Sequence, residues 1–281
     1  IHLIMMFLHL LMVSVLSGGS AEVVHDFRKK CADIFANGAS PTILHGHRYK
    51  QICQTLKKKV YYATLCDTYN KIPVYSAYKF NKGIRCERKH VWRIEPQVRI
   101  LLYIHMNLDN PGEGPNMVPD RSRQSSNQAV CDDYKHSVYD RGHLMPVYLA
   151  SSQDCADATF SLTNVAPQKP CFNRGQWRML EEKVAKELTE QCLSNENTAY
   201  LVTGVVPGKR KLKGKVNVPS HFWTAYCCLD HNKECQISRG FIGENKNKNT
   251  ATDNITVNEL QGLLENLYKV KSFQLFSTKA N

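Results

Sequence analysis

The chain has 281 residues, of which 42% are hydrophobic and 22% charged, so it can bury a sizeable core. That balance excludes a chain that stays unfolded for lack of apolar residues. The formal net charge of +12 favours a polyanionic partner, namely nucleic acid, a heparin-like glycan or an anionic membrane surface, without selecting among them.

Residues 1–21 are expected to form a secretory signal peptide. They contain no Lys, Arg, Asp or Glu, and their apolar run, residues 1–16, is followed by the small residues SGGSA. The run is short for a membrane span, so an uncleaved anchor is the second alternative. No later stretch is apolar for long enough to cross a bilayer, and no stable membrane association is expected after cleavage. Residues 22–281 are expected to form one secreted domain with its core at about 50–275.

Several strands and one long loop are predicted in the first half of the mature chain. The segments 59–67 and 71–80 are rich in Val, Tyr and Ile, with turn residues between them, and predict a β-hairpin. Residues 90–96 predict a further strand. Residues 107–128 are dense in Pro, Gly, Ser and Asn and predict a long surface loop, which in compact domains is often functional.

The segment YDRGHLMP, residues 139–146, places an acid, a permanent cation, a glycine and a histidine side by side. Gly142 is expected to let the backbone bend between Arg141 and His143 without strain at a Cβ atom. The apolar residues 144–146 are expected to anchor the segment to the core. The alternative is that His143 is a packing or hydrogen-bonding residue.

The second half of residues 158–193 predicts an amphipathic helix, because its apolar residues recur at helical spacing. Those residues are Trp177, Leu180, Val184 and Leu188. Asn173 falls at or near the start of this helix, where asparagine is a favoured N-cap. Glu181, one turn beyond Trp177, is by itself an ordinary solvated carboxylate.

Two constellations follow near the C-terminal end. The basic run GKRKLKGK, residues 208–215, predicts either a solvated hairpin tip or a strip that follows a phosphate backbone. Cys227, Cys228, His231 and Cys235 fall within nine residues, but their spacing is not that of a zinc ribbon. All eleven cysteines lie beyond the predicted signal peptide, so disulfide bonds are favoured over zinc. The odd total leaves at least one thiol free or paired between chains.

His143, Arg141 and Asn173 together supply what phosphodiester hydrolysis requires. A neutral histidine is suited to activating water near neutral pH. The fork-shaped arginine suits a phosphate. Mg²⁺ keeps most of its own water, so one or two oxygen ligands, such as the Asn173 carbonyl, can hold it. The residues alone do not establish that the three side chains converge.

Two motifs carry a family resemblance. DRGH at 140–143, followed by TNVAPQKPCFNRGQWRMLE at 163–181, resembles the signature of the DNA/RNA non-specific endonucleases, which are ββα-metal (His-Me finger) nucleases. Residues 199–208 and 216–228 fit the same family, and the likeness covers roughly residues 50–275. The resemblance implies an α+β fold with a central mixed or antiparallel sheet flanked by helices. The chain departs from the family in its many cysteines, with Cys171 two residues before Asn173.

The resemblance also implies a role for each matching residue. His143 matches the general base, and Asn173 the single direct protein ligand to Mg²⁺, with Mn²⁺ as a possible substitute. Arg141 matches the arginine that contacts the phosphate. Glu181 matches an acid that hydrogen-bonds water around the metal, and Asn164 an asparagine that supports the site.

The resulting hypothesis is a secreted, Mg²⁺-dependent endonuclease that cuts DNA and RNA with little sequence preference. A metal and an arginine address only the phosphate, which all nucleotides share. The alternative is a secreted polyanion-binding or regulatory protein that keeps the nuclease fold. Such a protein would not need the intact set of His143, Asn173 and Glu181.

Overall fold

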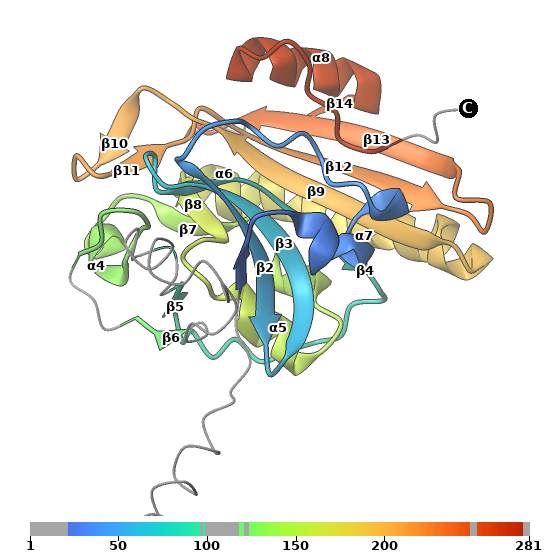
Figure 1. Ribbon diagram of the computed structural model, residues 1–281, viewed down its shortest axis with the longest axis horizontal. Coiled ribbons are helices and arrows are strands. Elements are labelled where there is room, and N and C mark those ends of the chain that lie inside the picture. The colour runs from blue at the N-terminus through green and yellow to red at the C-terminus, as the bar shows by residue number, and fades with distance from the viewer. Residues whose placement is uncertain (1–21, 96–97, 99–117, 121–123, 248–251, 278–281) are drawn as a thin grey trace, which may run out of the picture.

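An antiparallel sheet of eight strands forms the centre of the molecule in the computed structural model (Figure 1). The structure describes residues 22–95, 98, 118–120, 124–247 and 252–277. The predicted signal peptide and most of the predicted 107–128 loop therefore lie outside the described residues. In spatial order the strands are β1 (Glu22–Val24), β2 (Tyr49–Leu56), β3 (Lys59–Asp67), β4 (Ile72–Phe80), β9 (Thr198–Val206), β12 (His221–Leu229), β13 (Cys235–Glu244) and β14 (Asp253–Ile255).

The hairpin prediction is confirmed, because β3 and β4 are adjacent antiparallel strands within one residue of the predicted bounds. The strand predicted at 90–96 is reduced to β5 (Arg93–Ile94), which pairs with β6 (Val118–Pro119). The pairing stops at Glu95, whose backbone N–H donates to the side-chain oxygen of Gln128 instead of to a neighbouring strand.

Each face of the sheet carries its own hydrophobic core, because alternate residues of a strand point to opposite faces. In β12, Phe222 and Tyr226 belong to one core, while Trp223 and Ala225 belong to the other. Helix α7 (Arg178–Gln191) packs into the first core, and helix α8 (Val257–Tyr268) into the second. The amphipathic helix prediction is confirmed, since α7 and the turn before it bury Trp177, Leu180, Val184 and Leu188.

Shorter elements surround the sheet. They are three short 3-10 helices (Phe27–Lys29, Ala32–Ile34, Ala36–Gly38), α4 (Cys131–Tyr134), β7 (Asp140–His143), a 3-10 helix (Val147–Leu149), α5 (Gln153–Thr159), β8 (Val165–Gln168), α6 (Pro170–Phe172), a π-helical turn (Asn173–Trp177), a 3-10 helix (Leu193–Asn195), β10 (Arg210–Leu212) and β11 (Val216–Val218). The basic run at 208–215 forms the tip of the β10–β11 hairpin, and its turn contains Gly214 at φ 71°. None of the described helices is long and apolar enough to cross a membrane.

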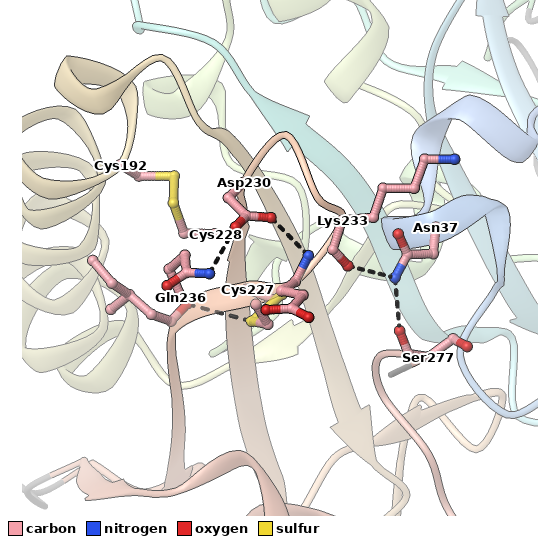
Figure 2. The surroundings of a disulfide bond; sticks show 11 residues. Asn37, Cys192, Cys227, Cys228, Asp230, Lys233, Gln236 and Ser277 are labelled. Atoms are coloured by element: carbon pink, nitrogen blue, oxygen red, sulfur yellow. Dashed lines mark hydrogen bonds between the residues drawn. A yellow bond between two sulfur atoms is a disulfide. The ribbon is translucent and has the colours of Figure 1, made fainter. Parts of the chain in front are cut away.

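Three disulfide bonds are present among the described residues, as predicted for this cysteine-rich sequence. Cys192–Cys228 ties the end of α7 to β12, and Cys227–Cys235 links β12 to β13 (Figure 2). The neighbours Cys227 and Cys228 bond in different directions because successive residues of a strand face opposite ways. Cys31–Cys53 joins the N-terminal segment to β2. Cys227, Cys228 and Cys235 are all in disulfide bonds, and His231 is exposed. The 227–235 cluster is therefore not a zinc site.

The turn between β12 and β13 lies where an N-terminal segment and the C-terminal segment of the described chain meet. Asp230 accepts a hydrogen bond from the Gln236 amide (2.8 Å) inside this turn (Figure 2). The Asn37 amide donates to the backbone carbonyls of Lys233 (3.2 Å) and Ser277 (3.1 Å). The N-terminal and C-terminal segments therefore meet beside the disulfides.

Candidate active site

The candidate site is built on the antiparallel pair β7–β8 and on the helix that follows it. In this pair Gly142 lies opposite Ala166, and His143 lies opposite Val165. A Cβ atom on Gly142 would lie 2.1 Å from the Gln168 side-chain oxygen. The expectation that Gly142 bends the chain is wrong, because it lies inside the strand without a positive φ. Glycine is required there because the buried Gln168 side chain packs against the Gly142 backbone, where a Cβ atom would clash with it.

His143 stands at the end of β7 among aromatic rings. Its ring centroid lies 5.4 Å from that of Trp92 and 5.2 Å from that of Phe160. Its Nε2 atom is buried and has no hydrogen-bond partner in the part of the chain that the structure describes. A buried polar atom without a partner is uncommon and calls for a physical explanation.

The surroundings of His143 keep its imidazole neutral. Burial lowers its pKa to about 3, and the positive charges of Arg88 and His90 act in the same direction. A backbone hydrogen bond with Arg141 opposes this shift but is weaker. At neutral pH the ring is therefore uncharged, and only an uncharged imidazole can act as a base.

Among the described residues, Arg141 contacts aromatic rings and forms no ion pair with an acid. Its guanidinium carbon lies 4.8 Å from the Trp92 ring centroid and 5.3 Å from that of Tyr134. One terminal nitrogen donates a long hydrogen bond, 3.4 Å, to the carbonyl of Cys131. The Nε atom is buried without a partner among the described residues. The planar cation is thus positioned by cation–π contacts while its charge stays available to an anion.

Asp140 connects the strand to the helix that carries Asn173. Its carboxylate accepts a hydrogen bond from the Asn173 amide nitrogen at 2.9 Å. It also accepts two from Arg174, at 2.9 and 2.7 Å. Two of these three contacts form a bidentate arginine–carboxylate pair, which fixes direction as well as distance.

Asn173 is not the N-cap of α7 that the sequence suggests, because Trp177 occupies that position. Asn173 has helical φ and ψ of −58° and −53°, and α6 begins before it at Pro170. The chain continues from α6 through the π-helical turn into α7, with non-helical angles at Gly175. Turns of this type inside helices are frequent at functional sites. The Asn173 amide nitrogen is used by Asp140, so its carbonyl oxygen remains as an acceptor.

Glu181 lies two turns further along the same helix. Burial raises the pKa of its carboxyl to about 8, and the positive charge of Arg88 counteracts part of that shift. Since Arg88 acts electrostatically on both His143 and Glu181, these two side chains lie near one cation. Within the described residues no hydrogen bond joins His143, Asn173 and Glu181 directly. Asp140 links Asn173 to β7, the strand that carries His143, and Arg88 acts electrostatically on His143 and Glu181.

Asn164 is fully buried and has no polar capacity left for a ligand. Its side-chain oxygen accepts from Ser76 and from the backbone of Met145, each at 3.0 Å. Its nitrogen donates to the carbonyls of Met145 and Thr159, also at 3.0 Å. Asn164 thus ties the residues after β7 to those before β8.

Sequence reasoning missed several residues of this site. They are Arg88, His90, Trp92, Tyr134 and Arg174. Arg174 had a detectable signal, because it follows Asn173 directly. Arg88, His90 and Trp92 lie more than forty residues before Arg141, so only the fold brings them to the site, whereas Tyr134 precedes Arg141 by seven residues.

The available donors suit a hard cation that keeps its own water. The free Asn173 oxygen is a neutral ligand of the type that Mg²⁺ accepts. No group of three or more His, Cys, Asp or Glu side chains in the described ranges could enclose a metal ion. The residues present therefore fit a lightly ligated Mg²⁺ and not a closed metal site of the zinc type.

Both the sequence and the fold of this chain are similar to those of known nucleases. The sequence profile of the DNA/RNA non-specific endonuclease family matches residues 40–274. The endonuclease domain-containing 1 protein of Homo sapiens is 32% identical over 235 residues, covering 84% of this chain and 45% of that protein. Human mitochondrial endonuclease G is 38% identical over 118 residues, covering 37% of this chain and 38% of its own. This chain spans less than half the length of either relative.

A chain in the crystal structure of the EndoG/EndoGI complex shares the fold, with a TM-score of 0.50 and 20% identity. The match covers 74% of this chain and 81% of that one. At this identity the likeness shows the fold alone. It confirms the predicted α+β, ββα-metal nuclease architecture, in which β7, β8 and the helix through α7 form the ββα unit.

Proposed function

Because this chain belongs to the DNA/RNA non-specific endonuclease family, we propose that it is an endonuclease that hydrolyses phosphodiester bonds in DNA and RNA with little sequence preference. The observation that carries the proposal concerns two side-chain atoms of the ββα unit, His143 Nε2 and the Asn173 oxygen. His143 Nε2 is buried and unpartnered among the described residues. In the same unit Asp140 accepts a hydrogen bond from the Asn173 amide nitrogen, and no described residue donates a hydrogen bond to the Asn173 side-chain oxygen.

In the proposed reaction, water attacks the phosphorus atom while His143 Nε2 accepts its proton. The phosphorus–oxygen bond to the leaving group then breaks, and the leaving oxygen gains a proton from the solvent. Arg141, which contacts the rings of Trp92 and Tyr134, binds the phosphate oxygens as negative charge develops on them. The largely protonated Glu181 provides a hydrogen-bond donor for water in the site.

Asn173 would hold Mg²⁺ or Mn²⁺ through its side-chain oxygen. When bound, such an ion supplies electrostatic stabilisation of the phosphate and of the leaving oxygen. The role of Asp140 is to orient the Asn173 amide, and the role of Asn164 is to position β7 against β8. Both are positioning residues, because their polar atoms are used within the protein.

We also propose that the protein is exported. The three disulfide bonds support this, since such bonds are rare in a reducing cytosol and common in secreted proteins. An exported nuclease would meet DNA and RNA released from cells.

The test is cleavage of plasmid DNA and of RNA by the purified protein, with Mg²⁺ and with EDTA. We expect both polymers to be cut only with the metal. His143→Asn should lose roughly 10²–10⁴-fold in rate, and Asn173→Ala should be inactive with an unchanged melting temperature. His231→Asn is the matched control, because that histidine is exposed in the β12–β13 turn. A wild-type protein that binds nucleic acid but never cuts it would instead support a polyanion-binding protein.

A further inference from the structure

A groove of about 670 Å³ lies beside the candidate site, between residues 82–88 and the exposed side of α7. Its base includes Tyr148 from the 3-10 helix that follows β7. Tyr148 is 55% exposed, and Ile84, which also lines the groove, is 51% exposed. Two large apolar side chains thus remain accessible in one groove, and neither is needed for the core.

The two walls of the groove differ in charge. Lys82, Arg85 and Arg88 line one wall and form no hydrogen bond or ion pair with any described residue. On the α7 wall, Glu182 pairs with Arg178 of its own helix at 2.5 Å. Glu190 in the same wall lies 3.9 Å from Lys186. The acids are therefore balanced within the helix, while the three cations remain available to an anionic ligand.

The cationic wall is held firmly against the protein. The Gly83 backbone lies so close to Tyr148 that an added Cβ atom would be 3.0 Å from its carbonyl oxygen. The Ile84 N–H donates to the Ala150 carbonyl at 3.1 Å. Glu87 and Gln153 exchange two hydrogen bonds, of 2.9 and 3.0 Å, between the backbone of one and the amide of the other. A ligand would therefore meet a largely formed groove, which lowers the entropic cost of binding.

Arg88 links the groove electrostatically to two of the proposed catalytic residues. Arg88 lines it, and the same Arg88 acts electrostatically on His143 and Glu181. Tyr148 follows His143 by only five residues. A strand bound in the groove would therefore pass Arg88, the cation that acts on His143, as well as Arg85 and Lys82.

We propose that this groove binds single-stranded nucleic acid next to the scissile phosphate, with bases against Tyr148 and Ile84 and phosphates along Lys82, Arg85 and Arg88. The proposal rests on the function proposed above and adds a substrate class to it. Only an unpaired strand presents free base faces, because the bases of a duplex are stacked on each other. The combination of cations with an exposed aromatic ring is the usual form of such sites.

The test measures binding of a short fluorescent oligothymidylate by anisotropy in EDTA, so that nothing is cut. Two variants alter the groove, Tyr148→Ala and the double variant Lys82→Ser/Arg85→Ser. The controls are Leu263→Ala and Lys271→Ser, which change an exposed apolar residue and an exposed cation in and just after α8, on the opposite core. Arg88 is left intact because of its effect on His143.

We expect Tyr148→Ala to weaken binding about tenfold, within the range of one base–aromatic stack. The double variant should reduce the dependence of log affinity on log salt by about 0.7 for each phosphate that the protein no longer neutralises. Both controls should bind as the wild type does, and a duplex of equal length should be bound equally by wild type and Tyr148→Ala.

Wild-type affinity for the oligonucleotide in both groove variants would overturn the inference, even if the protein cuts nucleic acid. Equal displacement by an acidic peptide or a heparin fragment of the same charge would also overturn it, since neither presents base faces. If groove variants lose binding while the wild type never cuts, the groove stands and the proposed nuclease function fails.

Discussion

At the scale of single residues, burial determines the chemistry of this site more than any charged neighbour does. Desolvation is the largest cause of the lowered pKa of His143 and of the raised pKa of Glu181. Burial always disfavours the charged form, so it moves a base and an acid in opposite directions. The same fold thereby keeps a histidine neutral and a carboxyl largely protonated at neutral pH.

The pH dependence of cleavage should reflect the lowered pKa of His143. An exposed histidine would lose its basic form as pH falls through about 6.5, whereas His143 should keep it until pH approaches about 3. We therefore expect single-turnover cleavage at saturating Mg²⁺ to show no loss centred near pH 6.5. A clear loss centred there would mean that the ring is solvated in the working enzyme.

A second buried acid, Glu95, lies outside the proposed chemistry and should affect stability. Burial raises its pKa to about 7, against hydrogen bonds from Ser161, Gln54 and Thr163 that favour the carboxylate. The folded state keeps the proton that the unfolded state loses above about pH 4.3. Its contribution to stability is thus full below that pH and is lost as pH rises through about 7.

Glu95→Gln should therefore raise the melting temperature at alkaline pH and change it little near pH 4. The amide keeps the shape of the acid without the buried charge. Thermal unfolding of both proteins, followed at several pH values, measures the difference. A gain that is equal at every pH would show that the proton on Glu95 is irrelevant.

At the scale of elements, the Asp140 carboxylate of β7 joins the strand to the helical segment that carries Asn173. Asp140 is only 18% exposed and holds both Asn173 and Arg174. The π-helical turn places these two consecutive residues on the side that faces β7. The geometry of the proposed metal ligand is therefore decided by contacts between elements.

Asp140→Ala should raise the Mg²⁺ concentration needed for half-maximal cleavage by about 10- to 100-fold, as loss of an orienting partner does at metal sites. The rate at saturating Mg²⁺ should fall much less. Arg178→Ala is the control, because it removes a surface pair within α7. If Asp140→Ala lowered only the saturated rate, Asp140 would act on the chemistry and not on the ligand.

At the scale of the whole molecule, two cores on opposite faces of one sheet are joined to their surroundings by disulfides. Cys192–Cys228 spans 36 residues and links α7 to the sheet, while Cys227–Cys235 spans 8 within one hairpin. Closing a longer loop removes more entropy from the unfolded chain. The cross-links therefore contribute unequally to the stability of the sheet.

Cys192→Ala/Cys228→Ala should cost about 1 kcal/mol more in unfolding free energy than Cys227→Ala/Cys235→Ala, from the loop-length difference alone. Burial of Cys192 and Cys228 adds to this cost, since Cys235 is exposed. Urea unfolding of the two double variants under non-reducing conditions measures the difference. Equal losses would show that strain or residual structure outweighs chain entropy here.

Much of the local structure could be predicted from the sequence. The strands at 59–67 and 71–80 and the apolar face of α7 follow from side-chain periodicity, which acts over neighbouring residues. The preference of Cys227, Cys228 and Cys235 for disulfides follows from composition. The strand expected at 90–96 is shorter in the structure, because the side chain of Gln128, far along the chain, accepts the hydrogen bond of the Glu95 N–H.

The sequence by itself determined the residue types of the site and their order, because DRGH and the helix with Asn173 are continuous stretches. Only the tertiary structure decided how they meet. Asp140 reaches Asn173 across 33 positions, and Trp92 reaches Arg141 across a still longer separation. Such contacts depend on strand pairing and on the packing of two cores. Periodicity and spacing record only what lies a few residues away, so they do not contain this information.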